Sequence, residues 1–158
     1  MVFLVAIPLC SLFFYIPRKN EDSKATGRRQ RIASFAISMI SYPIGWLVLS
    51  LINAPHILTA AAAIYTFVAL GLMISNLLIR YKASGHAAGV AGPVAAMIYL
   101  YGVYATPLIV LLPLVTWARL AAEGHNFWQT VVGATWSALV SIVVLWLFGF
   151  PPFLGALW

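Results

Sequence analysis

Two histidines stand beside basic residues at the ends of apolar segments, in a chain with few charged side chains. His86 follows Lys82 by four residues, and His125 follows Arg119 by six. An imidazole changes its protonation near neutral pH, so it can donate or accept a proton or act as a nucleophile. The planar guanidinium group of arginine matches the oxygens of a phosphate. These residue types therefore indicate phosphate chemistry.

The neighbours of both histidines fit this interpretation. Ser84 and Gly85 precede His86 at the predicted start of a helix, where backbone N–H groups bind anions. The alternative is a capped helix start with a histidine at the headgroup level. Gln129 lies four residues after His125, so both share one face if the stretch is helical. The amide oxygen of Gln129 could then hold the imidazole, but an interfacial helix with ordinary polar residues would look the same.

The composition points to lipid rather than water as the surroundings. Of 158 residues, 63% are apolar and 8% are charged, whereas a soluble domain carries about 25% charged residues. The length suits one domain covering residues 1–158. Nine Lys/Arg outnumber three Asp/Glu, and they lie between apolar segments, which favours an anionic lipid or a phosphate over nucleic acid. The single cysteine, Cys10, excludes an internal disulfide.

Six apolar segments are candidate membrane-spanning helices, since a span needs about 20 mostly apolar residues. They cover residues 2–16, 33–52, 57–79, 86–101, 105–117 and 129–148. The predicted fold class is therefore all-α, a polytopic membrane protein with six transmembrane helices. The fourth and fifth segments leave little room for a turn at Gly102 and could form one re-entrant hairpin. Gly85, Gly89 and Gly92 favour two closely packed helices instead.

The charges support this count of spans. With six spans, the first, third and fifth loops share one face, and all nine basic and all three acidic residues fall on it. The other face holds His56, which we expect at the interface, and the tail of residues 151–158. The positive-inside rule places the charged face in the cytoplasm. A basic run follows the first segment instead of preceding it, so we expect a retained span and not a signal peptide.

The order and spacing of these residues resemble the type 2 phosphatidic acid phosphatase superfamily over nearly the whole chain. That family carries the motifs Lys-x6-Arg-Pro, Pro-Ser-Gly-His and Ser-Arg-x5-His-x3-Asp. This chain has Lys24-x6-Arg31, then Ser84-Gly85-His86, then Arg119-x5-His125-x3-Gln129. Gln129 stands where the family has Asp. Three other positions depart from the motifs, namely Ile32, Ala83 and Ala118 in place of Pro, Pro and Ser.

The resemblance implies a six-helix bundle and a lipid phosphatase that needs no metal and no other cofactor. By analogy, His125 would attack the phosphorus and form a phosphohistidine, His86 would protonate the leaving oxygen, and Gln129 would orient His125. The resemblance also implies a set of phosphate-binding residues, which are Lys24, Arg31, Lys82, Ser84, Gly85 and Arg119.

The expected partners are a lipid phosphate substrate and the surrounding membrane lipids, with no nucleic acid. A polyprenyl diphosphate or monophosphate is favoured, because the chain has little extramembrane part with which to recognise a large headgroup. Phosphatidate and phosphatidylglycerophosphate are the alternatives. A non-catalytic lipid-phosphate binding or transport protein and a small anion channel also fit the sequence. The expected location is the cell membrane; family analogy also allows a site on the outer face, and the oligomeric state stays open.

Overall fold

The computed structural model describes residues 23–122 and 126–153, with side chains from residue 32 onward except residue 34. Within these ranges the chain is helical and contains no strand, which confirms the predicted all-α class. Three helices in the described part are long and apolar enough to cross a membrane, namely His56–Leu78, Gly85–Ala121 and Phe127–Leu147. A shorter apolar helix covers Phe35–Leu51. The predicted first span, residues 2–16, lies outside the described residues, so the count of six stays a prediction.

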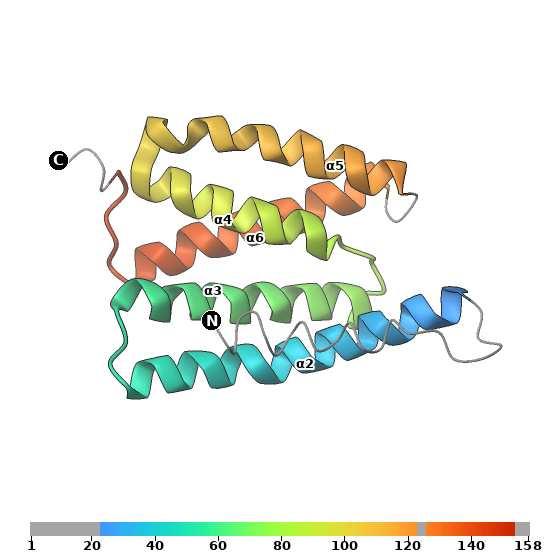
Figure 1. The fold of residues 1–158 in the computed structure, drawn as a ribbon, viewed down its shortest axis with the longest axis horizontal. Helices are drawn as coiled ribbons and strands as arrows, with labels where there is room; N and C mark the ends of the chain where they lie inside the picture. The colour runs from blue at the N-terminus through green and yellow to red at the C-terminus, as the bar shows by residue number, and fades with distance from the viewer. Residues whose placement is uncertain (1–22, 123–125, 154–158) are drawn as a thin grey trace. The chain divides into compact units, whose positions relative to one another are not determined.

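The chain divides into two compact units, Met1–Ala69 and Leu70–Trp158. In the first unit, α2 (Ser23–Leu51) and the first part of α3 (His56–Met73) run in opposite directions (Figure 1). Their aromatic rings meet: the centroids of Tyr42 and Tyr65 are 5.4 Å apart, and those of Trp46 and Phe67 are 5.7 Å apart. The boundary between the units falls within α3, and the single domain expected from the length stays a prediction.

Helix α2 begins earlier than the apolar pattern predicts. It starts at Ser23 and not near residue 33, so much of the predicted first loop is helical. The residues of this stretch explain the difference, because most are good helix formers: Lys24, Ala25, Arg28, Arg29, Gln30 and Arg31. Hydropathy marks only the part of a helix that can enter the hydrocarbon, here Phe35–Leu51, and does not mark where the helix starts.

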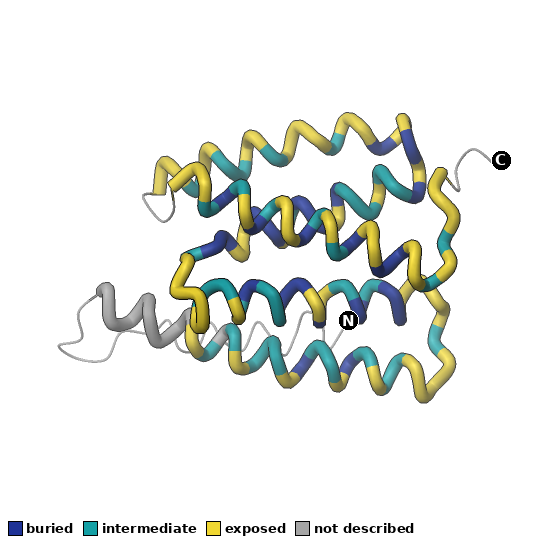
Figure 2. Tube along the Cα trace, turned by 180° about the vertical axis from the view of Figure 1, so that it is seen from behind, coloured by how far each residue is buried: buried dark blue, intermediate teal, exposed yellow. Residues whose placement is uncertain are grey.

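The second unit contains a π-helical turn, η3 (Ile74–Leu78), and the helices α4 (Gly85–Tyr101), α5 (Leu111–Ala121) and α6 (Phe127–Leu147). A 3-10 helix, η4 (Gly102–Val110), joins α4 to α5. Figure 1 shows α4 and α5 side by side and antiparallel, so α4 and α6 begin at the end where α5 finishes. Figure 2 shows that the three helices differ in burial: α4 and α6 contain buried residues, whereas α5 contains none.

The third predicted segment is confirmed as α3 together with η3, and the fourth and sixth are confirmed as α4 and α6. The ends of all three lie within two residues of the prediction. The fifth differs, since residues 102–110 are 3-10 helix and the α-helix starts only at Leu111. Pro107 lies inside this stretch, where its missing N–H removes one helical hydrogen bond. Gly102 makes the turn with a φ of 59°, against the ring of Phe153.

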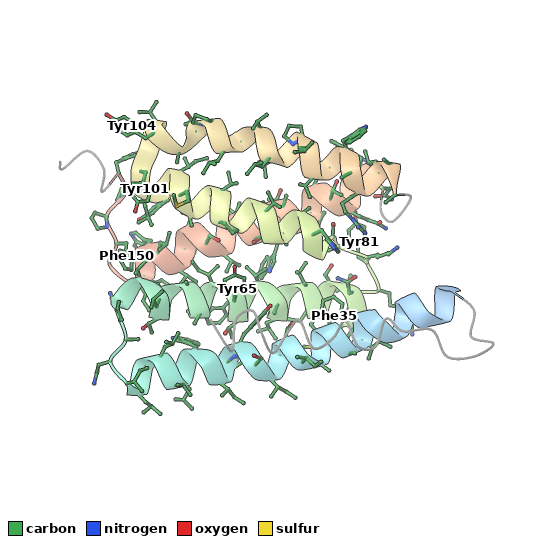
Figure 3. All side chains as sticks on the ribbon, viewed as in Figure 1. Phe35, Tyr65, Tyr81, Tyr101, Tyr104 and Phe150 are labelled. Carbon is green, nitrogen blue, oxygen red and sulfur yellow. The ribbon has the colours of Figure 1, made fainter. Side chains whose placement is uncertain are left out.

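The two ends of the second unit carry different side chains. Figure 3 places Tyr101, Tyr104 and Phe150 at the end where α4 finishes, and Tyr81 at the end where α4 begins. At the first end the hydroxyl of Tyr99 donates to the carbonyl of Phe150 at 2.9 Å, which holds the residues after α6 against α4. The second end holds the loop before α4, the last turn of α5 and the first turn of α6.

Candidate phosphate-binding site

The site begins in the loop that connects η3 to α4. Arg80 turns the chain with a φ of 60°, a left-handed conformation that non-glycine residues rarely adopt. The N–H of Tyr81 then donates to the carbonyl of Ser75 at 2.8 Å, and the N–H of Ala83 donates to the carbonyl of Tyr81 at 2.8 Å. Ala83 is 4% exposed and Ser84 is fully buried. The loop therefore enters α4 along a defined, buried path.

Ser84 is the N-cap of α4, so the capped helix start that the sequence left open as the alternative is present here. Its φ of −81° and ψ of 109° are extended, and its hydroxyl oxygen accepts a hydrogen bond from the N–H of Ala87 at 3.3 Å. The carbonyl of Ser84 accepts from the N–H of Ala88 at 3.1 Å. Gly85 and His86 are the first two residues of the helix, and both are exposed. Such positions present N–H groups that the helix does not use internally, which suits an anion.

A backbone hydrogen bond joins the segment of the second motif to that of the third. The N–H of Ser84 donates to the carbonyl oxygen of Gln129 at 2.9 Å. Gly133, one turn further along α6, permits this approach, because a Cβ there would overlap the carbonyl oxygen of Ser84. The glycine that makes the junction possible is not part of either motif. Its only sequence signal is a small residue inside an apolar span, where helices approach closely.

The side chain of Gln129 belongs to a capping box at the start of α6. The N–H of Gln129 donates to Oδ1 of Asn126 at 2.9 Å, and the N–H of Asn126 donates to Oε1 of Gln129 at 3.1 Å. Glutamine at the third helical position is typical of this motif. The amide oxygen predicted to hold His125 therefore already has a donor. A carbonyl oxygen has two lone pairs, so it can accept a second N–H.

Arg119 brings a permanent positive charge to the same end of the unit. It lies in the last turn of α5, where a cation also complements the helix dipole. The residue is half-buried, and its Nε atom is shielded from solvent. His86 lies in the first turn of α4, at the same end of the unit. Lys82 is half-buried in the loop before α4. This end thus combines an imidazole, two cations and a helix N-terminus, an arrangement that can bind and neutralise a phosphate.

The structure brings together part of the predicted site. The loop before α4 and the facing helix ends hold six of its residues: Lys82, Ser84, Gly85, His86, Arg119 and Gln129. His125, the predicted nucleophile, lies outside the described residues. Lys24 and Arg31 lie in α2, in the other unit, and their side chains are not among those described. Their contribution to the site stays a prediction.

Two polar residues next to the site are absent from the motifs. Ser75 and Asn76 lie in η3 and hydrogen-bond to the loop before α4. The sequence signal was available: a carboxamide within an apolar segment long enough to span a membrane is a functional candidate, because its polar group needs a partner there. Within residues 23–122 and 126–153, no three His, Cys, Asp or Glu side chains gather closely enough to share a metal ion.

Comparisons of this chain with protein-family models, with curated proteins and with solved structures found no match.

Proposed function

We propose that the protein is a six-helix integral membrane phosphatase of the type 2 phosphatidic acid phosphatase superfamily, acting on a phosphomonoester or diphosphate of a membrane lipid. The observation that carries this proposal is the hydrogen bond from the N–H of Ser84 to the carbonyl of Gln129. It links two segments that are far apart in the sequence and that carry the second and third motifs. The three apolar helices support a location in a membrane, for which we propose the cell membrane.

In the proposed reaction, an unprotonated nitrogen of His125 attacks the terminal phosphorus. The bond from phosphorus to the leaving oxygen breaks, and His86 in its protonated form gives its proton to that oxygen. A water molecule then attacks the phosphohistidine while His86 takes a proton from it. The products are inorganic phosphate and the lipid with one phosphate fewer, and both histidines return to their starting state.

The phosphate oxygens would be held by Arg119, by Lys82 and by the N–H groups at the start of α4. These groups act most strongly when negative charge builds up in the transition state, because they are fixed before the reaction begins. A bound phosphate would bring negative charge next to His86, which would favour the protonated, acidic form of that imidazole. Lys24 and Arg31 would complete the set.

For the substrate we propose a polyprenyl diphosphate or monophosphate, with phosphatidate and phosphatidylglycerophosphate as alternatives. The described residues are nearly all helix and short turns, which leaves little structure for reading a large headgroup. An isoprenoid tail would lie along the apolar helices. The basic residues of the charged face favour a cytoplasmic site. A cysteine introduced at Arg80 and labelled by an impermeant reagent from one side of the membrane would establish the sidedness.

The test is phosphate release from a panel of lipid phosphates by purified protein in EDTA. The panel contains polyprenyl diphosphate, polyprenyl monophosphate, phosphatidate and phosphatidylglycerophosphate. We expect turnover of at least one lipid and none with His125→Ala. If no lipid is hydrolysed faster by the wild type than by that variant, the protein is not a phosphatase of this type.

A second function, binding of lipid phosphates without catalysis, is favoured by one observation. The residue at the family's carboxylate position is an amide, and its oxygen is used in the capping box of α6. An amide can orient an imidazole but does not stabilise its cationic form as a carboxylate does. This alternative predicts that radiolabelled lipid phosphate binds equally well to the wild type and to His125→Ala, with turnover by neither.

A further inference from the structure

The loop before α4 is held by η3 as well as by α6. Ser75 makes two bonds with Tyr81: its carbonyl accepts the N–H at 2.8 Å, and its hydroxyl donates to the carbonyl at 3.1 Å. The amide nitrogen of Asn76 donates to the carbonyl of Leu72 at 2.8 Å and to the carbonyl of Ala83 at 3.3 Å. The second of these bonds leaves the helix and reaches the loop.

The π-helical turn explains how the adjacent residues Ser75 and Asn76 can both form hydrogen bonds with the loop before α4. The N–H of Ile79 donates to the carbonyl of Ile74 at 3.0 Å, five residues back, so this turn holds one residue more than an α-helical turn. Arg80, in its left-handed conformation, then directs the chain back along η3. Such a conformation persists only where surrounding bonds define it, and the bonds from Ser75 and Asn76 meet that condition.

One peptide unit is fixed at both of its polar ends. The carbonyl of Ala83 and the N–H of Ser84 belong to the same planar group. Asn76 donates to the carbonyl oxygen, while the N–H donates to the carbonyl of Gln129. Ala83 and Ser84 are buried, so the loss of either bond would leave the carbonyl of Ala83 or the N–H of Ser84 without a partner. That group could reach a new partner only if the peptide plane rotated.

We propose that Asn76 is a positioning residue for the phosphate: by holding the Ala83–Ser84 peptide, it directs the N–H groups of Gly85 and His86 toward the phosphate oxygens. This inference rests on the function proposed above. Asn76 itself does not touch the substrate. Its effect passes through the peptide plane to the first turn of α4, and so to the helix end that binds the anion.

The variants that test this are Asn76→Ser and Asn76→Ala, with Leu78→Ala as the control. A serine can donate to the carbonyl four residues back but is too short to reach Ala83. It therefore keeps the bond within the helix and removes only the bond to the loop. Leu78 lies in the same turn with its side chain 74% exposed, and its truncation leaves the polar contacts in place.

We expect both Asn76 variants to lower kcat by about 10- to 100-fold, because a small misplacement of catalytic groups costs up to about 100-fold. KM should stay near the wild-type value, since the lipid tail and the cationic side chains supply most of the binding. The thermal midpoint of Asn76→Ser in detergent should lie slightly below that of Leu78→Ala, because a buried carbonyl loses one hydrogen bond. Leu78→Ala should keep wild-type kcat. Wild-type kcat in Asn76→Ser would overturn the proposal.

A binding readout separates this inference from the proposed catalysis. Inorganic phosphate should slow hydrogen exchange of the Gly85 and His86 amides in the wild type and in Leu78→Ala, but not in Asn76→Ser. Absence of lipid turnover by the wild type would refute the proposed phosphatase activity. Protection of these amides by phosphate in the wild type, but not in Asn76→Ser, would still support the positioning role of Asn76. Equal protection in wild type and Asn76→Ser would refute the positioning role.

Discussion

The backbone N–H of Ser84 donates a 2.9 Å hydrogen bond to the carbonyl oxygen of Gln129. This bond connects the loop before α4 with the first turn of α6, 45 residues further along the chain (129 − 84). Residues from two of the three motifs are therefore joined by a backbone hydrogen bond, which does not depend on the conformation of their side chains. A site built on this junction depends on how closely α6 can approach the loop.

Gly133 sets that approach, so Gly133→Ala should destabilise the protein. The added Cβ would overlap the backbone carbonyl of Ser84, which cannot move aside as the tip of a flexible side chain can. Overpacking of this kind costs about 1–3 kcal/mol, and we expect a lower thermal midpoint in detergent together with loss of phosphate release.

Gly89→Ala is the matched control, since a Cβ at Gly89 meets nothing within 4 Å. Replacing a glycine inside a helix by alanine stabilises by about 0.5–1 kcal/mol where there is space. The two variants should therefore shift the midpoint in opposite directions. Equal shifts would contradict the close contact between Gly133 and Ser84.

Asn126→Ala should loosen the start of α6. Asn126 is the N-cap, and its side chain accepts the N–H of Gln129 at 2.9 Å. Loss of such a cap costs about 0.5–2 kcal/mol, whereas aspartate caps about as well as asparagine. Asn126→Asp should therefore keep the wild-type midpoint, measured by thermal unfolding in detergent. If Asn126→Ala also keeps it, the capping box does not hold the first turn of α6.

Gln129→Glu should raise kcat for lipid phosphate hydrolysis. Glutamate keeps the oxygen that accepts the N–H of Asn126, because either residue completes a capping box. It also places a carboxylate where the motif has aspartate, and replacing the carboxylate of a serine-protease triad by an amide costs about 10⁴ in rate. We expect a gain of about tenfold or more, measured as phosphate release at saturating lipid.

The control for that gain is Gln129→Leu, which removes the amide oxygen and adds no charge. It should lower both kcat and the thermal midpoint. A lower kcat in Gln129→Glu than in the wild type would show that the neutral amide is the working residue at this position.

The hydrophobic pattern was sufficient to locate helices whose apolar length matches a bilayer. It predicted α3, α4 and α6, because burial in lipid and helix formation depend on the same uninterrupted run of apolar residues. It missed the first turns of α2, which are helical through the propensity of polar residues such as Arg28 and Gln30. It also missed the 3-10 helix of residues 102–110, because hydropathy does not distinguish a 3-10 helix from an α-helix.

For the candidate site, the sequence could predict which residues take part from their types and spacing, but not the hydrogen bonds between them. The motif spacing pointed to Ser84, His86 and Arg119, which the structure places at one end of the second unit. It does not include Asn76. A carboxamide within an apolar span marks that residue as a candidate, but its hydrogen bond across the π-helical turn to Ala83 could not be read from the sequence. Nor could it assign Gln129 to the capping box, since the partner, Asn126, lies between the motif positions and belongs to no motif.

Arg119→Ala should lower kcat/KM by about 100-fold or more, as expected when a fixed positive group is removed from a developing negative charge. Arg119→Lys should recover only part of the loss, because an ammonium does not reproduce the planar fork of the guanidinium group. Arg80→Gln is the control: it removes one positive charge from the same end of the unit, at an exposed residue. Equal losses in Arg119→Ala and Arg80→Gln would mean that only the net charge matters.

We propose that His125 carries the phosphoryl group between the lipid and water. The most direct measurement is rapid quenching of purified protein mixed with a lipid phosphate that is radiolabelled in its terminal phosphate. We predict protein-bound label that appears before free phosphate in the wild type and is absent from His125→Ala. Release of labelled phosphate by His125→Ala at the wild-type rate, or a wild type that neither retains nor releases label, would contradict the claim.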